Sequence, residues 1–342
     1  AARAVAADIG KAAIAVAAPS LRRRRRPRVG GRAGAEAAAG VDGGGGRRRL
    51  DGAARAYAES ESIRRQLLSD APVRDEARRD LAVVLTKRGG VDRARGDLSS
   101  AERAYAESLT IRRALVAESP GDPERLRDLS VSLERIGDVA RERGDLAEAV
   151  APYKESLAIR RRLLAREPRD EDRLFDLAIV LNRVGDLARE RGDLVEAQAV
   201  YTESLTIRRQ LLRHSPAQPD RMWSVVVGLR KLGDLATDRA DFESAQRSLA
   251  EATTLAMRLV ALDDARPAFR HELALEMVSA ARLAEAEGDV TRARTQWEVA
   301  RQTLAPLLTR ATPDVEWINT DRLCGEALAR LVNAVEKPTP SN

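Results

Sequence analysis

The chain has 342 residues, of which 33% are charged and only 3% are aromatic. Alanine, leucine, arginine and glutamate dominate, which is the composition of long helices. A single cysteine excludes an intrachain disulfide, and no apolar run approaches the roughly 20 residues that a membrane helix needs. We therefore expect an all-α cytoplasmic protein with no membrane association.

The net charge of +6 comes from the start of the chain. Residues 1–50 contain 12 basic and 3 acidic residues, which leaves 47 basic and 50 acidic residues for the rest. Residues 1–49 are rich in Arg, Gly and Ala and allow two interpretations: an arm that binds nucleic acid or an anionic surface, or a disordered leader or wrongly framed sequence. We favour the second and do not expect a nucleic-acid partner, because no aromatic residue stands between the arginines to stack on bases.

After this leader the sequence repeats with a period of 48 residues. An Arg-Gly-Asp-Leu string and its degenerate copies begin at Arg95, Arg143, Arg191, Arg239 and Glu287. A column of large side chains keeps the same step at Tyr57, Tyr105, Tyr153, Tyr201, Leu249 and Trp297. A column of small residues precedes each string at Gly89, Gly137, Gly185, Gly233 and Ala281. Such a period indicates an array of identical structural units.

Each unit reads as two helices. Apolar residues have helical spacing over Leu129–Glu142, and Gly144 ends this helix because glycine accepts the left-handed conformation. We expect Asp145 to cap the next helix, with Glu148 completing a capping box. Where the two helices cross, the small column is expected to leave room for the large one.

Several columns together resemble the tetratricopeptide repeat. The resemblance rests on Leu133, Ile136 and Gly137, followed by Ala149, Tyr153 and Ser156. The period of that family is about 34, so each unit here is longer by about 14 residues and resembles the lengthened units of kinesin light chains and bacterial sensor proteins.

The resemblance implies an α-solenoid, a right-handed superhelix of antiparallel helix pairs. Residues 50–335 would then form about five and a half repeats: one lone second helix at Leu50–Leu68, five units, and a closing helix at Trp317–Val332. Residues 336–342 would be a disordered tail. The closing helix is expected to cover the last open apolar face.

The family also implies a function, namely a protein-interaction scaffold or docking module that binds a partner protein or peptide in a concave groove lined by first helices. A regulatory fragment of a larger multidomain signalling protein of bacterial type is an alternative. The candidate groove residues are Lys87, Arg135, Asp138, Asn182, Arg183, Asp186, Arg230, Lys231 and Asp234. Two roles stay open for these charges: pairing with each other along one helix, or binding an extended peptide.

The second helices carry another charged ladder. It consists of Arg64/Arg65, Arg112/Arg113, Arg160/Arg161 and Arg208/Arg209, with Glu59, Glu107, Glu155 and Glu203 alongside. Because both signs recur together, we expect a solvated face that pairs with itself.

We find no constellation that predicts an enzyme. His214 and His271 lie in different units without a carboxylate or cysteine at metal-ligand spacing, so no metal site is expected. Cys324 has no nearby histidine and is expected to be a buried thiol. Gly43–Gly46 lacks the ending of a phosphate loop, so we expect no cofactor.

Overall fold

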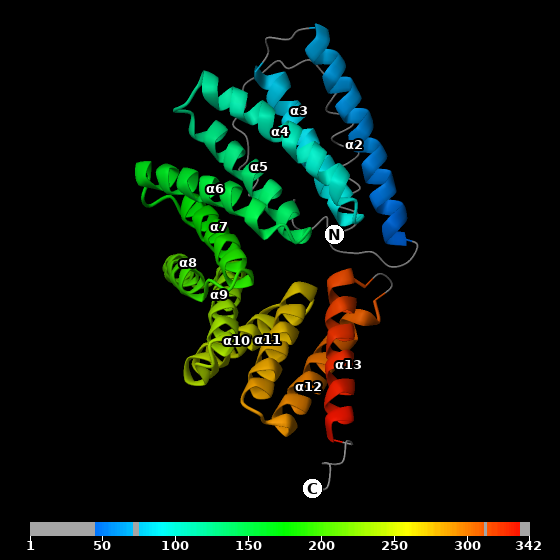
Figure 1. The fold of residues 1–342 in the computed structure, drawn as a ribbon, viewed down its shortest axis with the longest axis vertical. Helices are drawn as coiled ribbons and strands as arrows, with labels where there is room; N and C mark the ends of the chain where they lie inside the picture. Colours follow the sequence, from blue (N-terminus) through cyan, green and yellow to red (C-terminus); the bar gives the residue numbers. More distant parts are fainter. Residues whose placement is uncertain (1–44, 71–74, 311–312, 336–342) are drawn as a thin grey trace. The chain divides into compact units, whose positions relative to one another are not determined.

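A computed structural model describes residues 45–70, 75–310 and 313–335 of the chain. These residues form twelve α-helices and no strand. The helices, labelled in Figure 1, are α2 (Gly45–Asp70), α3 (Asp75–Ala94), α4 (Leu98–Glu118), α5 (Pro123–Glu142), α6 (Leu146–Arg166), α7 (Glu171–Glu190), α8 (Leu194–His214), α9 (Pro219–Asp238), α10 (Phe242–Leu262), α11 (Pro267–Ala286), α12 (Val290–Leu308) and α13 (Val315–Val335). The expected all-α solenoid of consecutive helix pairs is confirmed.

The two predicted terminal segments are only partly described. The helix expected to start at Leu50 begins at Gly45 instead, so the last residues of the predicted leader are helical. Residues 1–44 and the predicted tail at 336–342 lie outside the described residues.

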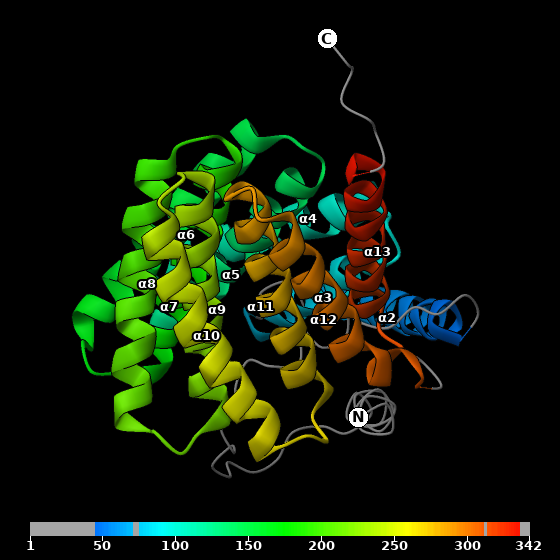
Figure 2. The same cartoon turned by 90° about the horizontal axis from the view of Figure 1, so that it is seen from below.

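The chain divides into two compact units at Val139 and Ala140. In the first unit, α3 packs against α4 and also against α2. In the second unit, α7/α8, α9/α10 and α11/α12 form helix hairpins, and each first helix also packs on the second helix of the preceding repeat. Figure 2 shows α10, α11 and α12 following one another in this way, and α13 packs against α12. Each helix pair therefore buries its apolar faces against both neighbours, as solenoid repeats do.

The Arg-Gly-Asp-Leu strings form the tight turns between paired helices. In the turn after α5, Gly144 donates its N–H to the carbonyl of Arg141, and Asp145 donates to that of Ala140. This is the Schellman pattern, which satisfies carbonyls at the end of a helix and needs a left-handed residue. Positive φ angles of 79–84° occur at Gly96, Gly144, Gly192 and Gly288. Ala240 holds the same position with a φ of 56°, so the turn persists where the glycine is lost.

The aspartate of each string begins the second helix. Asp193, for example, accepts a hydrogen bond from the backbone N–H of Glu196 at 3.0 Å, and Asp97, Asp241 and Asp289 cap in the same way. The predicted side-chain cap is wrong for Asp145, whose side chain makes no capping hydrogen bond. Its carboxylate lies 3.4 Å from Nε of Arg143, an ion pair that draws the side chain away from the helix end.

The crossings of α3 with α4, α7 with α8 and α9 with α10 follow the predicted pairing of small and large columns. An added Cβ at Gly185 would lie 2.4 Å from the ring of Tyr201, and one at Gly89 would lie 2.6 Å from the ring of Tyr105. In the last repeat, Ala281 and Trp297 belong to one buried cluster. The close approach of the helices therefore depends on the missing side chain, which confirms the steric reason for this column.

Candidate functional site

Asp186, one of the predicted groove residues, is the centre of a polar cluster in the second unit. It comes from α7 and receives Nζ of Lys231 from α9 at 2.6 Å. The hydroxyl of Tyr201 donates to it at 2.5 Å, and Nη1 of Arg141 lies 3.5 Å away. Burial alone would raise the pKa of Asp186, but Lys231 and the hydrogen bonds outweigh it, and its pKa lies below the ordinary value. The carboxylate is therefore ionised and already satisfied by its neighbours.

The other two predicted aspartates are also held by arginines of the preceding repeat. Nη1 of Arg189 lies 3.9 Å from Asp234, and Nη1 of Arg93 lies 3.8 Å from Asp138. Pairing within one helix also occurs, since Arg135 donates to Asp138 at 3.3 Å. The predicted pairing along one helix is thus correct for Arg135, whereas the other arginines bridge successive repeats. Sequence reasoning missed the bridges, although the two columns are separated by a constant 45 residues.

Arg230 belongs to a second buried polar cluster, which sequence analysis did not predict. Its Nη2 bonds Glu272 on α11 at 3.0 Å, and its Nε lies 3.2 Å from Oε1 of Glu276. Nε1 of Trp223 donates to the other oxygen of Glu272 at 2.8 Å. Glu276 is fully buried, and neither of its oxygens accepts a hydrogen bond in the described structure. Burial raises its pKa to about 9 despite Arg230, so this carboxyl is neutral near pH 7.

Lys87 differs from the groove cations Arg135, Arg230 and Lys231, which each have a carboxylate partner. It lies half-buried on α3, and no carboxylate within the described residues forms an ion pair with it. Burial and the positive charge of Arg135 lower its pKa. Lys231 is three repeats further on in the same column and has a carboxylate partner, whereas the described part of the chain provides none for Lys87.

The remaining predicted groove residues, Asn182 and Arg183, are half-buried on α7. Oδ1 of Asn182 is buried and accepts no hydrogen bond from the described part of the chain. Arg183 has a polar partner. The nine predicted residues therefore do not meet in one site: three lie in the first unit and six in the second.

The arginine ladder of the second helices pairs with itself, as expected. Arg65 lies 2.6 Å from Glu107, and the pairs Arg161–Glu203 and Arg209–Glu251 have the same distance. These exposed pairs each join a second helix to the next one. In the second unit the other arginine of each pair is buried instead: Nη1 of Arg160 bonds Asp176 at 2.5 Å, and Nη1 of Arg208 bonds the carbonyl of Ser224 at 3.1 Å.

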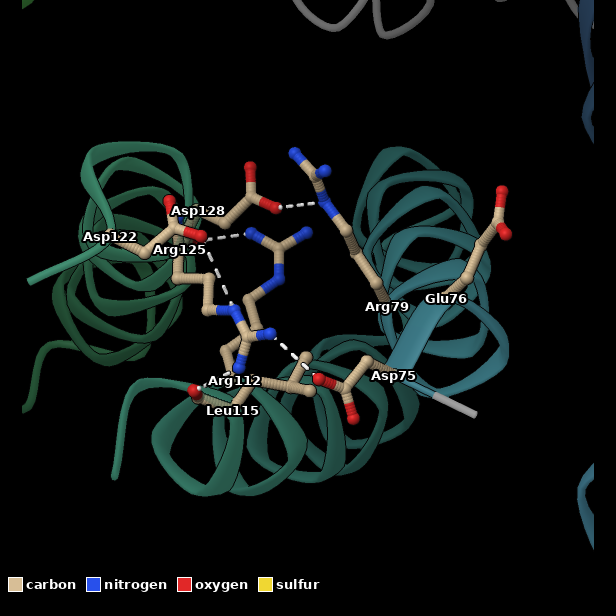
Figure 3. A pocket seen from close by; sticks show the side chains of 8 residues that line it. All are labelled: Asp75, Glu76, Arg79, Arg112, Leu115, Asp122, Arg125 and Asp128. Carbon is tan, nitrogen blue, oxygen red and sulfur yellow. Dashed lines mark hydrogen bonds and ion pairs between the residues drawn. The ribbon is translucent and has the colours of Figure 1, made fainter. Parts of the chain in front are cut away.

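The first unit also contains a polar cavity of about 290 Å³, which sequence analysis did not predict (Figure 3). Arg125 crosses it, with Nη2 2.7 Å from Asp75 and Nη1 donating to the carbonyl of Leu115 at 2.6 Å. Nε of Arg79 bonds Asp128 at 3.0 Å. The walls are formed by Asp75, Glu76, Arg79, Arg112, Leu115, Asp122, Arg125 and Asp128. The lining charges largely neutralise one another. The cavity spans two repeats, because α3 and α4 belong to one repeat and α5 belongs to the next.

Cys324, His271 and His214, which were considered as catalytic or metal-binding candidates, each lie in a structural environment. Cys324 is fully buried, and burial raises its pKa to about 11, so its thiol stays protonated near neutrality. Nε2 of His271 lies 3.2 Å from Oγ1 of Thr320, and Nδ1 of His214 lies 3.5 Å from Glu171. Among the described residues, no group of three potential ligands could hold a metal ion. None of the described helices has the length and apolarity to cross a bilayer.

Comparison with known proteins agrees with this architecture. The family described as tetratricopeptide repeat matches residues 130–170. Among solved structures, BtubC (BKLC) from P. vanneervenii is similar with a TM-score of 0.56 and 17% identity, covering 76% of this chain and 93% of that one. A Rap protein complexed with competence and sporulation factor gives a TM-score of 0.47 and 14% identity, with 84% and 72% covered. No curated protein matches the sequence.

The helix pairs, their turns and their crossings define an α-solenoid of repeated helical hairpins. Residues 130–170, which include most of α5 and all of α6, match the tetratricopeptide-repeat family.

Proposed function

We propose that this chain is a protein-interaction scaffold that binds an acidic segment of a partner protein on its first helices. Lys87 is the observation that carries this proposal. This ammonium is half-buried beside a second cation, and no carboxylate of the described residues pairs with it, so it is destabilised and gains from an incoming negative charge. In the second unit the equivalent cation, Lys231, already has Asp186, so an acidic ligand has less to gain there.

The proposal includes no catalysis by this chain and places it in a reducing compartment, the cytoplasm. The buried, protonated thiol of Cys324 supports both points, because it is unsuited to nucleophilic attack and is the single cysteine. The fold class supports binding in general, since tetratricopeptide repeats present extended surfaces to other proteins.

A quantitative pull-down tests the proposal. The full chain and its Lys87→Glu variant are immobilised, exposed to extract of the native source and compared by mass spectrometry. The control is Lys154→Glu, a lysine on the second helix α6 whose side chain is 59% exposed. We expect specific partners to be depleted at least about tenfold by Lys87→Glu and retained by Lys154→Glu, and to elute with moderate salt. Equal recovery on all three proteins would refute the assigned face.

A further inference from the structure

The first and last described helices are half repeats of opposite kinds. A shift of 48 residues places α2 in the register of the second helices, since α4 begins at Leu98 and ends at Glu118. The same shift places α13 in the register of the first helices, since α11 spans Pro267–Ala286. Among the described helices, α2 therefore lacks a first helix, and α13 lacks a second helix.

Among the described residues, nothing covers one face of α2, whereas the corresponding faces of the other second helices are buried. This α2 face consists of Ala53, Tyr57, Ser60 and Leu67, which share one side of the helix at spacings of four, three and seven. Leu67 is 54% exposed, whereas its equivalents at Leu115, Leu163, Leu211, Leu259 and Leu307 are 0–4% exposed. Ala53 and Tyr57 are half-buried, although the alanine and the large side chain of every later repeat are fully buried.

Among the described residues, a complementary face of α13 is uncovered as well. This α13 face consists of Ile318, Arg322, Gly325, Ala329 and Val332, at spacings of four and three. Val332 is 41% exposed, whereas the equivalent residues of α3, α5, α7, α9 and α11 are at most 8% exposed. Ala329 stands in the column of Gly89 and Ala281 that receives the large side chain of the second helix, yet here it is exposed. A Cβ added at Gly325 would meet no atom within 4 Å.

We propose that α13 of one chain packs on α2 of a second copy and completes a repeat between two molecules. Ala329 would receive the ring of Tyr57 as Ala281 receives Trp297 and Gly185 receives Tyr201 within the chain. The contact thus continues an interface that the array already makes between first and second helices in α3/α4, α7/α8, α9/α10 and α11/α12. It covers Leu67 and Val332, the most exposed apolar residues of the two faces.

Arg322 is the one charged residue of the α13 face, where other first helices carry Ala, Ser or Val. Its side chain is 70% exposed, donates to Oδ1 of Asn319 at 3.3 Å and lies 4.0 Å from Glu326. On α2 the exposed Glu59 stands next to Ser60, the equivalent of Ser108, which in α4 bonds the carbonyl of Ala82. Ala82 is the equivalent of Arg322, so in the proposed contact Arg322 lies at the level of Ser60 of the second copy.

The contact joins two different surfaces and is therefore heterologous, so it extends chains head to tail. It involves a single helix pair and belongs to the small, weak class of interfaces. We therefore expect a mass that rises with concentration above the monomer value of 37.3 kDa, without a fixed end point.

Sedimentation equilibrium of the full chain tests this proposal with one variant on each face. Leu67→Glu blocks α2 and Val332→Glu blocks α13, and both residues are exposed enough for the helix content to be kept. Val195→Glu, at an exposed position on α8, is the matched control. We expect the wild type and the control to associate over a hundredfold range of concentration, and each blocking variant to associate at least about tenfold more weakly.

The mixture of the two variants is the decisive sample. Leu67→Glu keeps its α13 face and Val332→Glu keeps its α2 face, so an equimolar mixture has one productive contact and is expected to stop at the dimer. A wild type that stays monomeric, as it would if residues 1–44 or another protein covered α2, overturns the proposal. So does a variant that self-associates like the wild type, which would indicate a contact between like faces, or a mixture that stays monomeric.

Discussion

Replacing Gly185 by alanine tests the packing of the repeat at its closest point. The new Cβ would lie 2.4 Å and 2.6 Å from two ring carbons of Tyr201, and relief requires the ring to move by about 1 Å toward the ordinary contact distance of roughly 3.5 Å. Tyr201 is 1% exposed, and its hydroxyl bonds Asp186 at 2.5 Å, so the ring is held at both ends.

The expected cost follows from these contacts. Overpacking costs about 1–3 kcal/mol, and the strained hydrogen bond to a charged group adds about 1.5 kcal/mol. Alanine in a helix recovers about 1 kcal/mol relative to glycine. We therefore expect Gly185→Ala to lower the free energy of unfolding by about 1.5–3.5 kcal/mol, measured by urea denaturation followed by circular dichroism.

Gly325→Ala is the matched control, because its helical position is open and only the propensity gain of about 1 kcal/mol remains. The control is measured in dilute solution. If Gly185→Ala were as stable as the wild type while Gly325→Ala gained stability, the assigned crossing of α7 and α8 would be wrong.

Four further substitutions have expected outcomes. Ala240→Gly should stabilise the chain by about 0.5–1 kcal/mol, because it relieves a positive φ of 56°, while Gly192→Ala in the equivalent turn should destabilise it; equal melting temperatures would contradict this. Glu276→Gln should stabilise the chain by up to about 3 kcal/mol at pH 7, because folding raises the pKa of Glu276 to about 9 and the wild type must take up a proton. The free energy of unfolding of the wild type should therefore fall relative to that of the variant as the pH rises from about 4.5 to 9. Denaturation curves of the two proteins should converge near pH 4. A difference in stability that does not depend on pH would exclude proton uptake. Arg209→Ala should cost at most about 1 kcal/mol and lose that effect in high salt, since its pair with Glu251 is half exposed on both sides; a larger, salt-independent loss would show that the pair is not an ordinary surface bridge.

The sequence predicted the fold well because the repeat displays each structural rule several times. The glycine of each turn, the aspartate caps and the Gly–Tyr crossing could all be read from columns 48 residues apart. The capping role of Asp145 failed because Arg143, a neighbour in the turn, binds its carboxylate instead. Local sequence gives the order of such residues but not which of two nearby partners is geometrically closer.

The candidate site was less accessible to sequence reasoning. Whether Asp186 pairs within α7 or with Lys231 on α9 depends on how two repeats stack, which no spacing along one helix reveals. Sequence analysis missed Glu276 because the equivalent positions of earlier repeats are Ser132, Val180 and Gly228. No repeated pattern therefore predicted a buried carboxyl at this position. The unpaired state of Lys87 likewise became visible only once its neighbours were placed.

The ion pairs between aspartates and arginines of successive repeats influence where local unfolding of the second unit begins. From α5 to α9 the repeats are joined by the partly solvated pairs of Arg141 and Arg189, whereas α9 and α11 are joined by Arg230 and the buried Glu272. Salt screens exposed charges far more than buried ones. Raising the ionic strength should therefore weaken the contact between α7 and α9 before the contact between α9 and α11. Hydrogen exchange would then show local unfolding that begins at the α7–α9 boundary inside the array and not at its end.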